Sequence, residues 1–274
     1  MEKDINNIIE ESVKYLKYWN SNKKIPLYKN DFKNYIEPED NQITIHIENN
    51  PDSSEEIYHN DNMENQKIDT IVSDKQELFL ENWASCENLT VFENEICKCT
   101  KCAIGNTRIK FVFGTGNPES KVVLVGEAPG ADEDKEGKPF VGRAGKLLTD
   151  ILKAINFSRD EVYICNILKC RPPENRNPEP QEISNCIPYL FKQLSLIKPD
   201  LILALGSFAA QNLLNLNLSL GKMRGKFYEI IISDKTVKVL VTYHPAALLR
   251  NPKWKYDTWE DVKMLRKEYD KISK

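Results

Sequence analysis

The sequence predicts an α/β protein, a three-layer sandwich with a central sheet of four mainly parallel strands, preceded by an N-terminal extension. Two observations predict this fold. From residue 108 onward, short apolar runs alternate with longer segments of helical periodicity, which is typical of a parallel sheet covered by helices. All 11 glycines lie at Gly105 or later, so the first part of the chain differs in composition from the rest.

The apolar runs and the segments between them define the expected elements of the sheet domain. Strands are expected at 121–125, 162–167, 201–205 and 237–242, and helices near 142–155, 179–197, 207–215 and 259–272. Polar motifs follow three of the strands: GEAPGADEDKEGKPFVG, NILKCRPPENRNP and YHPAALLRNP. Because ligands of such sheets bind beyond the carboxyl ends of the strands, we expect the functional site where these motifs meet.

Charge separates the extension from the rest of the chain. Residues 1–85 contain 9 Lys, no Arg and 18 Asp and Glu, a net charge of −9. Residues 86–274 contain 29 Lys and Arg against 23 Asp and Glu, a net charge of +6. We therefore divide the chain into an acidic extension and a basic domain at this point. Within the extension, apolar spacing predicts short helices at 5–19 and 74–85, and the acidic, Asn-rich composition of 37–70 predicts a disordered tether.

Four cysteines have the spacing of a metal site. Cys99 and Cys102 form a C-x-x-C pair, and Cys170 and Cys186 form a distant second pair. Four thiolates are the usual complement of a [4Fe-4S] cluster or of a structural zinc ion. The spacing alone therefore predicts a metal site of one of these two kinds.

Two further cysteines and the start of the chain complete this interpretation. Cys97 is an alternative to Cys99 as a ligand, although the C-x-x-C spacing favours Cys99, and Cys165 within VYICNI is expected to be a core thiol. The opening MEKDINNIIEESVKYLKYW has no apolar signal-peptide core, and no membrane-spanning segment is expected. We therefore expect a cytoplasmic protein with reduced cysteines rather than disulfides.

Taken in order, the motifs of the basic domain resemble one known family. They are CTKC, FVFGTGNP, GEAPGADEDKEGKPFVGRAGKLL, VYICNILKCRPPENRNP, KPDLILALG, MRGKFY and YHPAALLRNP. Over about residues 95–269 the chain resembles family 4 of the uracil-DNA glycosylase superfamily, the iron-sulfur uracil-DNA glycosylases. The resemblance implies the fold of that superfamily and a [4Fe-4S] cluster on the four cysteines. It also implies a DNA repair enzyme that flips deoxyuridine out of DNA, hydrolyses the N-glycosidic bond and leaves an abasic site.

The resemblance also implies roles for single residues. His244, the only histidine of residues 86–274, matches the histidine that donates a hydrogen bond to the uracil O2. Asn166 matches the residue whose amide contacts N3 and O4 of the base, and Phe140 matches the ring on which uracil stacks. These three residues, together with Ala128, are expected to form the uracil site.

The catalytic water has no single predicted ligand. The best-known glycosylase family places a water-orienting Asp where this chain has Ala128, a departure that family 4 shares. Glu127, Glu133 or backbone groups are then expected to hold the water. The aromatic residue that elsewhere excludes the thymine methyl group is replaced by Gly130.

The expected partner is uracil-containing DNA, single- or double-stranded, and we expect the protein to act as a monomer. Phosphate contacts are predicted for basic residues in or beside the motif loops, and Leu248 matches the apolar wedge that enters the minor groove. The basic candidates are Lys146, Arg171, Arg176, Arg224, Lys226, Arg250 and Lys253.

Two other functions are weighed against this one. A non-catalytic iron-sulfur protein that binds DNA or senses redox state would explain the cysteines but would leave Glu133, Asn166 and His244 without a role. A nucleotide-binding α/β module is disfavoured, because GEAPGADED is neither a G-x-G-x-x-G nor a P-loop motif.

Overall fold

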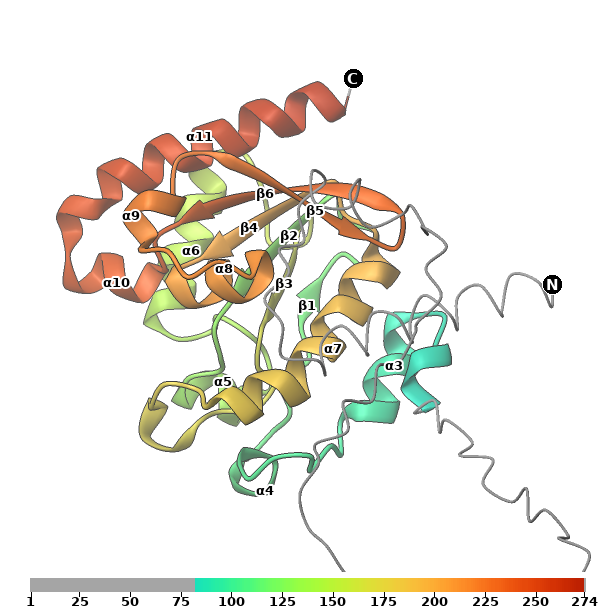
Figure 1. The fold of residues 1–274 in the computed structure, drawn as a ribbon. Coiled ribbons are helices and arrows are strands. Elements are labelled where there is room, and N and C mark those ends of the chain that lie inside the picture. Colours follow the sequence, from blue (N-terminus) through green and yellow to red (C-terminus); the bar gives the residue numbers. More distant parts are fainter. Residues whose placement is uncertain (1–81, 274) are drawn as a thin grey trace, which may run out of the picture.

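The computed structural model describes residues 82–273, in which a six-stranded sheet lies between two layers of helices (Figure 1). The strands are β1 (Thr115–Gly116), β2 (Val122–Gly126), β3 (Tyr163–Asn166), β4 (Leu201–Leu205), β5 (Phe227–Ile232) and β6 (Lys235–Thr242). Their order is β1-β3-β2-β4-β6-β5. The four central strands are parallel, and β1 and β5 are antiparallel at the two edges. From β2 the chain passes to β3 on one side of β2, and it then crosses to β4 on the other side of β2. The topological switch point of the sheet, where the direction of the strand order reverses, therefore lies between β2 and β4.

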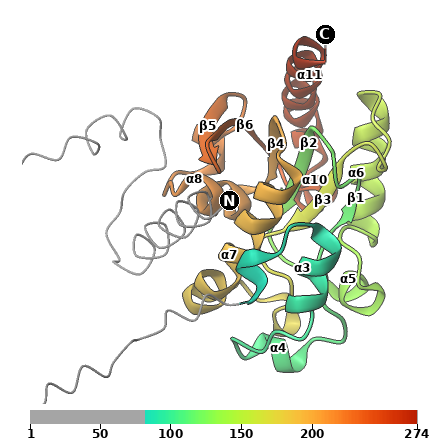
Figure 2. The same ribbon diagram turned by 90° about the vertical axis from the view of Figure 1, so that its right-hand side faces the viewer.

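The helices form one layer on each face of the sheet (Figure 2). One layer contains α6 (Arg143–Ala154) and α11 (Lys255–Ile272), and the other contains α3 (Leu89–Ile96), α7 (Pro180–Ile197) and α8 (Ser207–Leu214). Strand β2 contributes to both cores: Val122 and Leu124 pack in the α6 and α11 layer, and Val123 and Val125 pack in the α3, α7 and α8 layer. A strand that is buried on both faces is apolar at every position, which explains the continuous run VVLV.

The remaining helical segments are short and lie in the connections. They are η1 (Asn82–Ser85), α4 (Ile104–Thr107), α5 (Ala131–Glu136), η2 (Pro173–Asn175), α9 (Leu220–Met223), α10 (Pro245–Arg250) and η3 (Pro252–Trp254). Because α5 follows β2 and α10 follows β6, their motifs lie at the carboxyl edge of the sheet. Within residues 82–273, no helix is long and apolar enough to span a membrane.

The α/β fold class predicted from the sequence is confirmed. The four predicted strands are the four parallel strands, and the four predicted long helices are α6, α7, α8 and α11. The sheet differs from the prediction in its two antiparallel edge strands. Strand β5 returns to β6 through the two-residue turn Ser233 and Asp234, whose φ angles are 44° and 64°. A turn with two positive φ angles matches the twist of a hairpin, but Asn-Gly is its usual sequence signal.

Of the predicted acidic extension, the structure describes only residues 82–85. The Trp83 ring lies 5.2 Å from the ring of Tyr189 on α7, and Lys192 Nζ donates to the Ala84 carbonyl at 2.8 Å. These residues therefore contact the sheet domain. The helix predicted at 5–19, the tether at 37–70 and most of the helix at 74–85 lie outside the described residues, and the division of the chain at 85 and 86 stays a prediction.

Candidate active site

The predicted base-reading residues meet at the ends of β2 and β3. Asn166 is the last residue of β3 and is only 2% exposed, and its Oδ1 is buried with no hydrogen-bond partner among residues 82–273. Gly126 lies beside it at the end of β2. A Cβ atom at Gly126 would lie 2.4 Å from Asn166 Oδ1 and 2.6 Å from Phe140 Cζ. The missing side chain thus lets a polar amide and an aromatic ring approach the end of β2 closely.

Phe140 is held in a conformation that is uncommon for a non-glycine residue. Its φ angle is 54°, and its side chain is almost fully buried. Arg159 holds the loop by donating from Nη2 to the Pro139 carbonyl at 3.0 Å and from Nη1 to the Phe140 carbonyl at 3.1 Å. Gly145 lets this carbonyl approach α6, since a Cβ atom there would lie 1.8 Å from the Phe140 oxygen. Strain that is held in place in this way is typical of a functional site.

His244 lies beside Phe140 and caps α10. Its ring centroid is 5.4 Å from that of Phe140, and its Nδ1 accepts a hydrogen bond from the Ala246 N–H at 3.1 Å. Burial lowers the pKa of His244 to about 4, with a further lowering by the positive charge of Arg250. The ring is therefore neutral at pH 7. Because Nδ1 is an acceptor, Nε2 carries the proton and can donate it to a ligand.

The two candidate carboxylates have different surroundings. Glu133 accepts backbone hydrogen bonds from Gly130 at 3.1 Å, Val141 at 2.9 Å and Gly142 at 3.1 Å, so it holds the start of α5 and the loop after Phe140. The hydrogen bonds among the described residues include none to the Glu127 carboxylate, and burial raises the pKa of Glu127. Ala128 is half-buried and has no polar side-chain atom. Of these residues, Glu127 is the one with carboxylate oxygens available for a water molecule.

The four predicted metal ligands lie around one region between α3 and α7. Cys99 Sγ accepts from Tyr189 at 3.4 Å, Cys170 Sγ from Arg108 at 3.5 Å and Cys186 Sγ from the Lys169 N–H at 3.3 Å. Burial raises the pKa of Cys170 to about 11, opposed by Arg108, and Cys102 and Cys99 raise it further. Burial likewise raises the pKa of Cys186 to about 12, with contributions from Cys170 and Cys102. The four thiols therefore interact electrostatically with one another.

The thiol of the alternative ligand Cys97 contacts a different group. Its thiol donates to the Asn94 carbonyl at 3.3 Å, and it is not among the groups that shift the pKa values of Cys170 and Cys186. Cys165 is fully buried in β3, which agrees with the expected core thiol. The arrangement favours Cys99 over Cys97.

The arrangement of the thiols bears on which metal group they fit. Within residues 82–273, no group of three or more His, Cys, Asp or Glu side chains could hold a metal ion. A [4Fe-4S] cluster binds its four thiolates through four different irons, so its ligands are more widely spaced than those of one zinc ion. Four free thiols that surround one region, with donors from Arg108, Tyr189 and the Lys169 N–H, are a suitable donor set for the cluster.

Comparison with known proteins identifies the family. The model of the uracil DNA glycosylase superfamily matches residues 113–263, which is more than half of the chain. The chain belongs to this superfamily. A type-4 uracil-DNA glycosylase of Archaeoglobus fulgidus is 46% identical over 183 residues, 65% of this chain and 92% of the relative. A type-4 uracil-DNA glycosylase of Thermotoga maritima is 43% identical over 166 residues, 60% of this chain and 85% of the relative. A type-5 uracil-DNA glycosylase of Pyrobaculum aerophilum is 32% identical over 149 residues, 48% of this chain and 64% of the relative.

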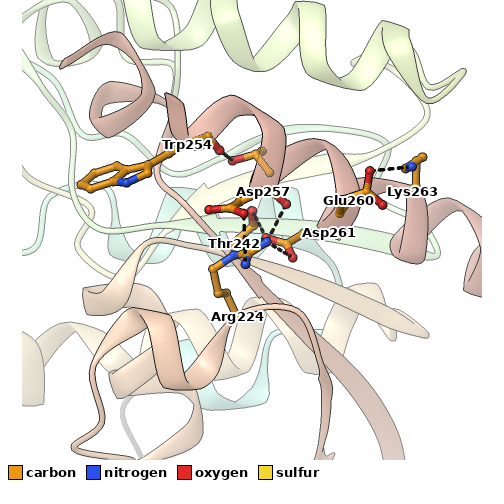
Figure 3. A network of polar contacts seen from close by, with 8 residues as sticks. Arg224, Thr242, Trp254, Asp257, Glu260, Asp261 and Lys263 are labelled. Carbon is orange, nitrogen blue, oxygen red and sulfur yellow. Dashed lines mark hydrogen bonds and ion pairs between the residues drawn. The ribbon is translucent and has the colours of Figure 1, made fainter. Parts of the chain in front are cut away.

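The predicted resemblance to type-4 members of the superfamily is confirmed. Two of the residues predicted to contact DNA, Arg224 and Arg176, form ion pairs within the domain. Arg224 donates to Asp261 at 2.8 Å and 3.1 Å and to the Asp257 carbonyl at 2.6 Å, and Thr242 donates to the same buried Asp261 at 2.7 Å (Figure 3). This network ties α11 to the end of β6, two residues before His244. Arg176 forms a two-pronged pair with Glu182 at 2.6 Å and 2.9 Å. Both arginines are therefore held by carboxylates in the structure.

The predicted wedge residue is buried in the structure. Leu248 is 0% exposed, because its position on the six-residue helix α10 faces the core, whereas the neighbouring Leu249 is 38% exposed. Leu248 would have to leave this position to enter a groove of DNA, and its role as the wedge stays a prediction. The other basic candidates remain accessible: Lys146, Lys226, Arg250 and Lys253 are exposed, and Arg171 is partly exposed and donates to Asn175 at 2.9 Å.

Two residues of the candidate site were not singled out from the sequence. Gly126 is part of the GEAPG motif, and a glycine at the end of a buried strand is a signal for close approach of another group. Arg159 lies outside every motif, in the connection between α6 and β3. Its role follows only from its contacts with the carbonyls of residues 139 and 140.

Proposed function

We propose that this protein is a uracil-DNA glycosylase, a hydrolase that releases uracil from DNA and leaves an abasic site for repair. The observation that carries the proposal is the buried, unpartnered Oδ1 of Asn166, which lies with the Phe140 ring against Gly126. Buried polar atoms are nearly always paired, so an orphaned acceptor at this place indicates a ligand that donates there. The relatives at 43–46% identity carry the same activity in their names.

Base identity follows from hydrogen-bond polarity. Uracil has an N–H donor at N3, which pairs with the free Asn166 Oδ1, and the amide NH2 of the same residue donates to O4. Cytosine has an acceptor at N3 and an amino group at C4, so both contacts would be mismatched. The Phe140 ring supplies the flat surface on which the flipped base stacks.

The chemical step requires stabilisation of the departing base. Cleavage breaks the bond between N1 of uracil and C1′ of the sugar and leaves negative charge on the base. The Nε2–H of neutral His244 donates to O2, where this charge accumulates, and such a donor contributes roughly 3–4 kcal/mol to lowering the barrier. A water held by Glu127 attacks C1′ from the opposite face, and the Glu127 carboxylate accepts the proton that the water loses as the new C–O bond forms.

We further propose that Cys99, Cys102, Cys170 and Cys186 hold a [4Fe-4S] cluster. When bound, the cluster cross-links the segment between α3 and α4 to the segment after β3 and to α7. Cys170 and Cys186 stay protonated at pH 7 when no metal is bound, so binding iron displaces their protons. Iron analysis and the absorption spectrum of anaerobically purified protein test the proposal. A colourless protein with one zinc ion per chain would overturn it.

The proposed partner is uracil-containing DNA, contacted by exposed Lys146, Arg250 and Lys253 and by Leu249 in place of Leu248. We also propose that the protein acts as a monomer in the cytoplasm. The seven cysteines of residues 82–273 are free thiols, as expected in a reducing compartment.

A single experiment distinguishes the enzyme from a non-catalytic iron-sulfur protein. Single-stranded oligonucleotides that carry one uracil, cytosine or thymine are incubated with excess protein, and abasic sites are cleaved with alkali. Release from the uracil strand alone, abolished or strongly slowed by His244→Ala, supports the proposal. DNA binding without release from any strand, in protein with a full iron content, would favour the non-catalytic alternative.

A further inference from the structure

Lys169 is a fully buried cation between the base-reading residue and two of the proposed cluster ligands. It is 0% exposed, follows Asn166 by three residues and directly precedes Cys170. Its Nζ donates to the Asn166 carbonyl at 2.8 Å and to Gln193 Oε1. Among the ion pairs of residues 82–273, none joins Lys169 to a carboxylate. A buried ammonium is costly unless its donors are used and anionic groups lie nearby.

The backbone of Lys169 contacts the cysteine region as well. Its N–H donates to Cys186 Sγ on α7 at 3.3 Å, and its carbonyl accepts from the Val112 N–H at 2.9 Å. The backbone of Lys169 is therefore held by Cys186, a proposed cluster ligand. The ammonium of Lys169 in turn holds the carbonyl of Asn166, the residue proposed to contact the base.

Gln193 completes this connection. It lies on α7 seven residues after Cys186, two helical turns along the same face, and is fully buried. Its Oε1 accepts from Lys169 and its Nε2 donates to the Phe113 carbonyl at 3.0 Å. The helix that carries Cys186 thus reaches Asn166 through only two side-chain hydrogen bonds.

We propose that Lys169 is a positioning residue that couples the cluster-binding helix α7 to base reading by Asn166. The inference rests on the proposed function and on the proposed cluster. Lysine suits this position because its ammonium donates to two carbonyl-type oxygens at once, and the thiolates of a bound cluster supply negative charge close to it. The cluster region then stabilises the uracil site through Lys169, in addition to cross-linking the chain.

The test uses Lys169→Met in the full-length, iron-loaded protein, with Lys192→Met as the matched control. Lys192 also lies on α7 and also donates to a backbone carbonyl, that of Ala84, but it is far from Asn166 in the hydrogen-bond network. Three quantities are measured: inhibition by free uracil, single-turnover release of uracil, and the rate of iron loss to a chelator.

Lys169→Met should weaken inhibition by free uracil about tenfold, as expected when a buried hydrogen-bonded position is lost. It should also speed iron loss several-fold, whereas Lys192→Met should leave both quantities near wild type. Uracil inhibition and iron loss that are both unchanged in Lys169→Met would overturn the inference. Absence of uracil release in the wild-type protein would instead overturn the proposed function.

A double variant separates positioning from simple packing. Lys169→Met leaves Gln193 Oε1 buried without its donor, and adding Gln193→Leu removes that unpaired acceptor. Because Gln193→Leu also removes the donor to the Phe113 carbonyl, the double variant should recover only part of the thermal stability. The Asn166 carbonyl still lacks its donor, so inhibition by free uracil should stay weak. Recovery of wild-type uracil inhibition together with stability would show that Lys169 matters only for packing.

Discussion

Gly126→Ala tests the close approach of Asn166 and Phe140 to the end of β2. The added methyl group would lie 2.4 Å from Asn166 Oδ1 and 2.6 Å from Phe140 Cζ, well inside normal contact distances. One of the two groups must shift, and Phe140 has little freedom because Arg159 holds its backbone. Overpacking of this kind costs about 1–3 kcal/mol, and each 1.4 kcal/mol is about a factor of ten in rate. We therefore expect kcat/KM for uracil release to fall roughly 10- to 100-fold.

Gly221→Ala is the matched control, since a Cβ atom at Gly221 would meet nothing within 4 Å. Both variants are compared by single-turnover release from a uracil oligonucleotide, by thermal unfolding and by inhibition with free uracil. Gly126→Ala should lose affinity for free uracil as well as rate, and Gly221→Ala should match wild type. Equal rates and equal uracil inhibition in the two variants would mean that the base does not bind beside Gly126.

Four further predictions concern the same site and the extension. His244→Ala should slow the chemical step by roughly two to three orders of magnitude with little change in DNA affinity, measured by single-turnover kinetics and by binding. Asn166→Asp should lose most uracil release and gain weak cytosine release, because a carboxylate accepts a hydrogen bond from the cytosine amino group. Equal rates of uracil release in the variant and the wild type would refute the assignment of Asn166 as the residue that contacts the base. The rate should fall at acidic pH as Glu127 becomes protonated, because burial raises the pKa of this carboxyl group. No separate step is expected near pH 6.5, since the pKa of His244 is lowered to about 4. Glu127→Gln should lower the rate and remove its dependence on pH in the acidic range. Deletion of residues 1–70 should leave turnover within a few-fold and tighten DNA binding at low salt, because it removes negative charge.

The parallel part of the sheet could be predicted because each of its strands is buried on both faces. Runs such as VVLV and LILAL are too short for helices, and the segments between them have helical periodicity. The edge strands gave weaker signals. Strand β1 has only two residues, and β5 pairs through a Ser-Asp turn that does not have the usual composition of a tight hairpin.

The positions of the motif residues could be predicted, but the contacts of individual side chains could not. Asn166 and His244 lie at the same edge of the sheet because parallel strands bring their carboxyl ends there. The sequence did not show that Arg224 has an ion-pair partner, because this partner, Asp261, is 37 residues away and was assigned no role. Leu248 and Leu249 are adjacent on a helix of only six residues, which is too short for apolar periodicity to show which one faces the core.

The two carboxylates of GEAPGADED show why residue type alone does not determine a catalytic role. Glu133 lies at the third position of α5, where free backbone N–H groups favour a carboxylate, and three such groups satisfy it. Glu127 lies between the end of β2 and that helix, where burial raises its pKa and the hydrogen bonds of the described residues leave its oxygens available. A carboxylate that already accepts three hydrogen bonds is poorly placed to orient a water molecule as well. The local geometry therefore assigns the scaffold role to Glu133 and leaves the water to Glu127, although the sequence presents both as equivalent candidates.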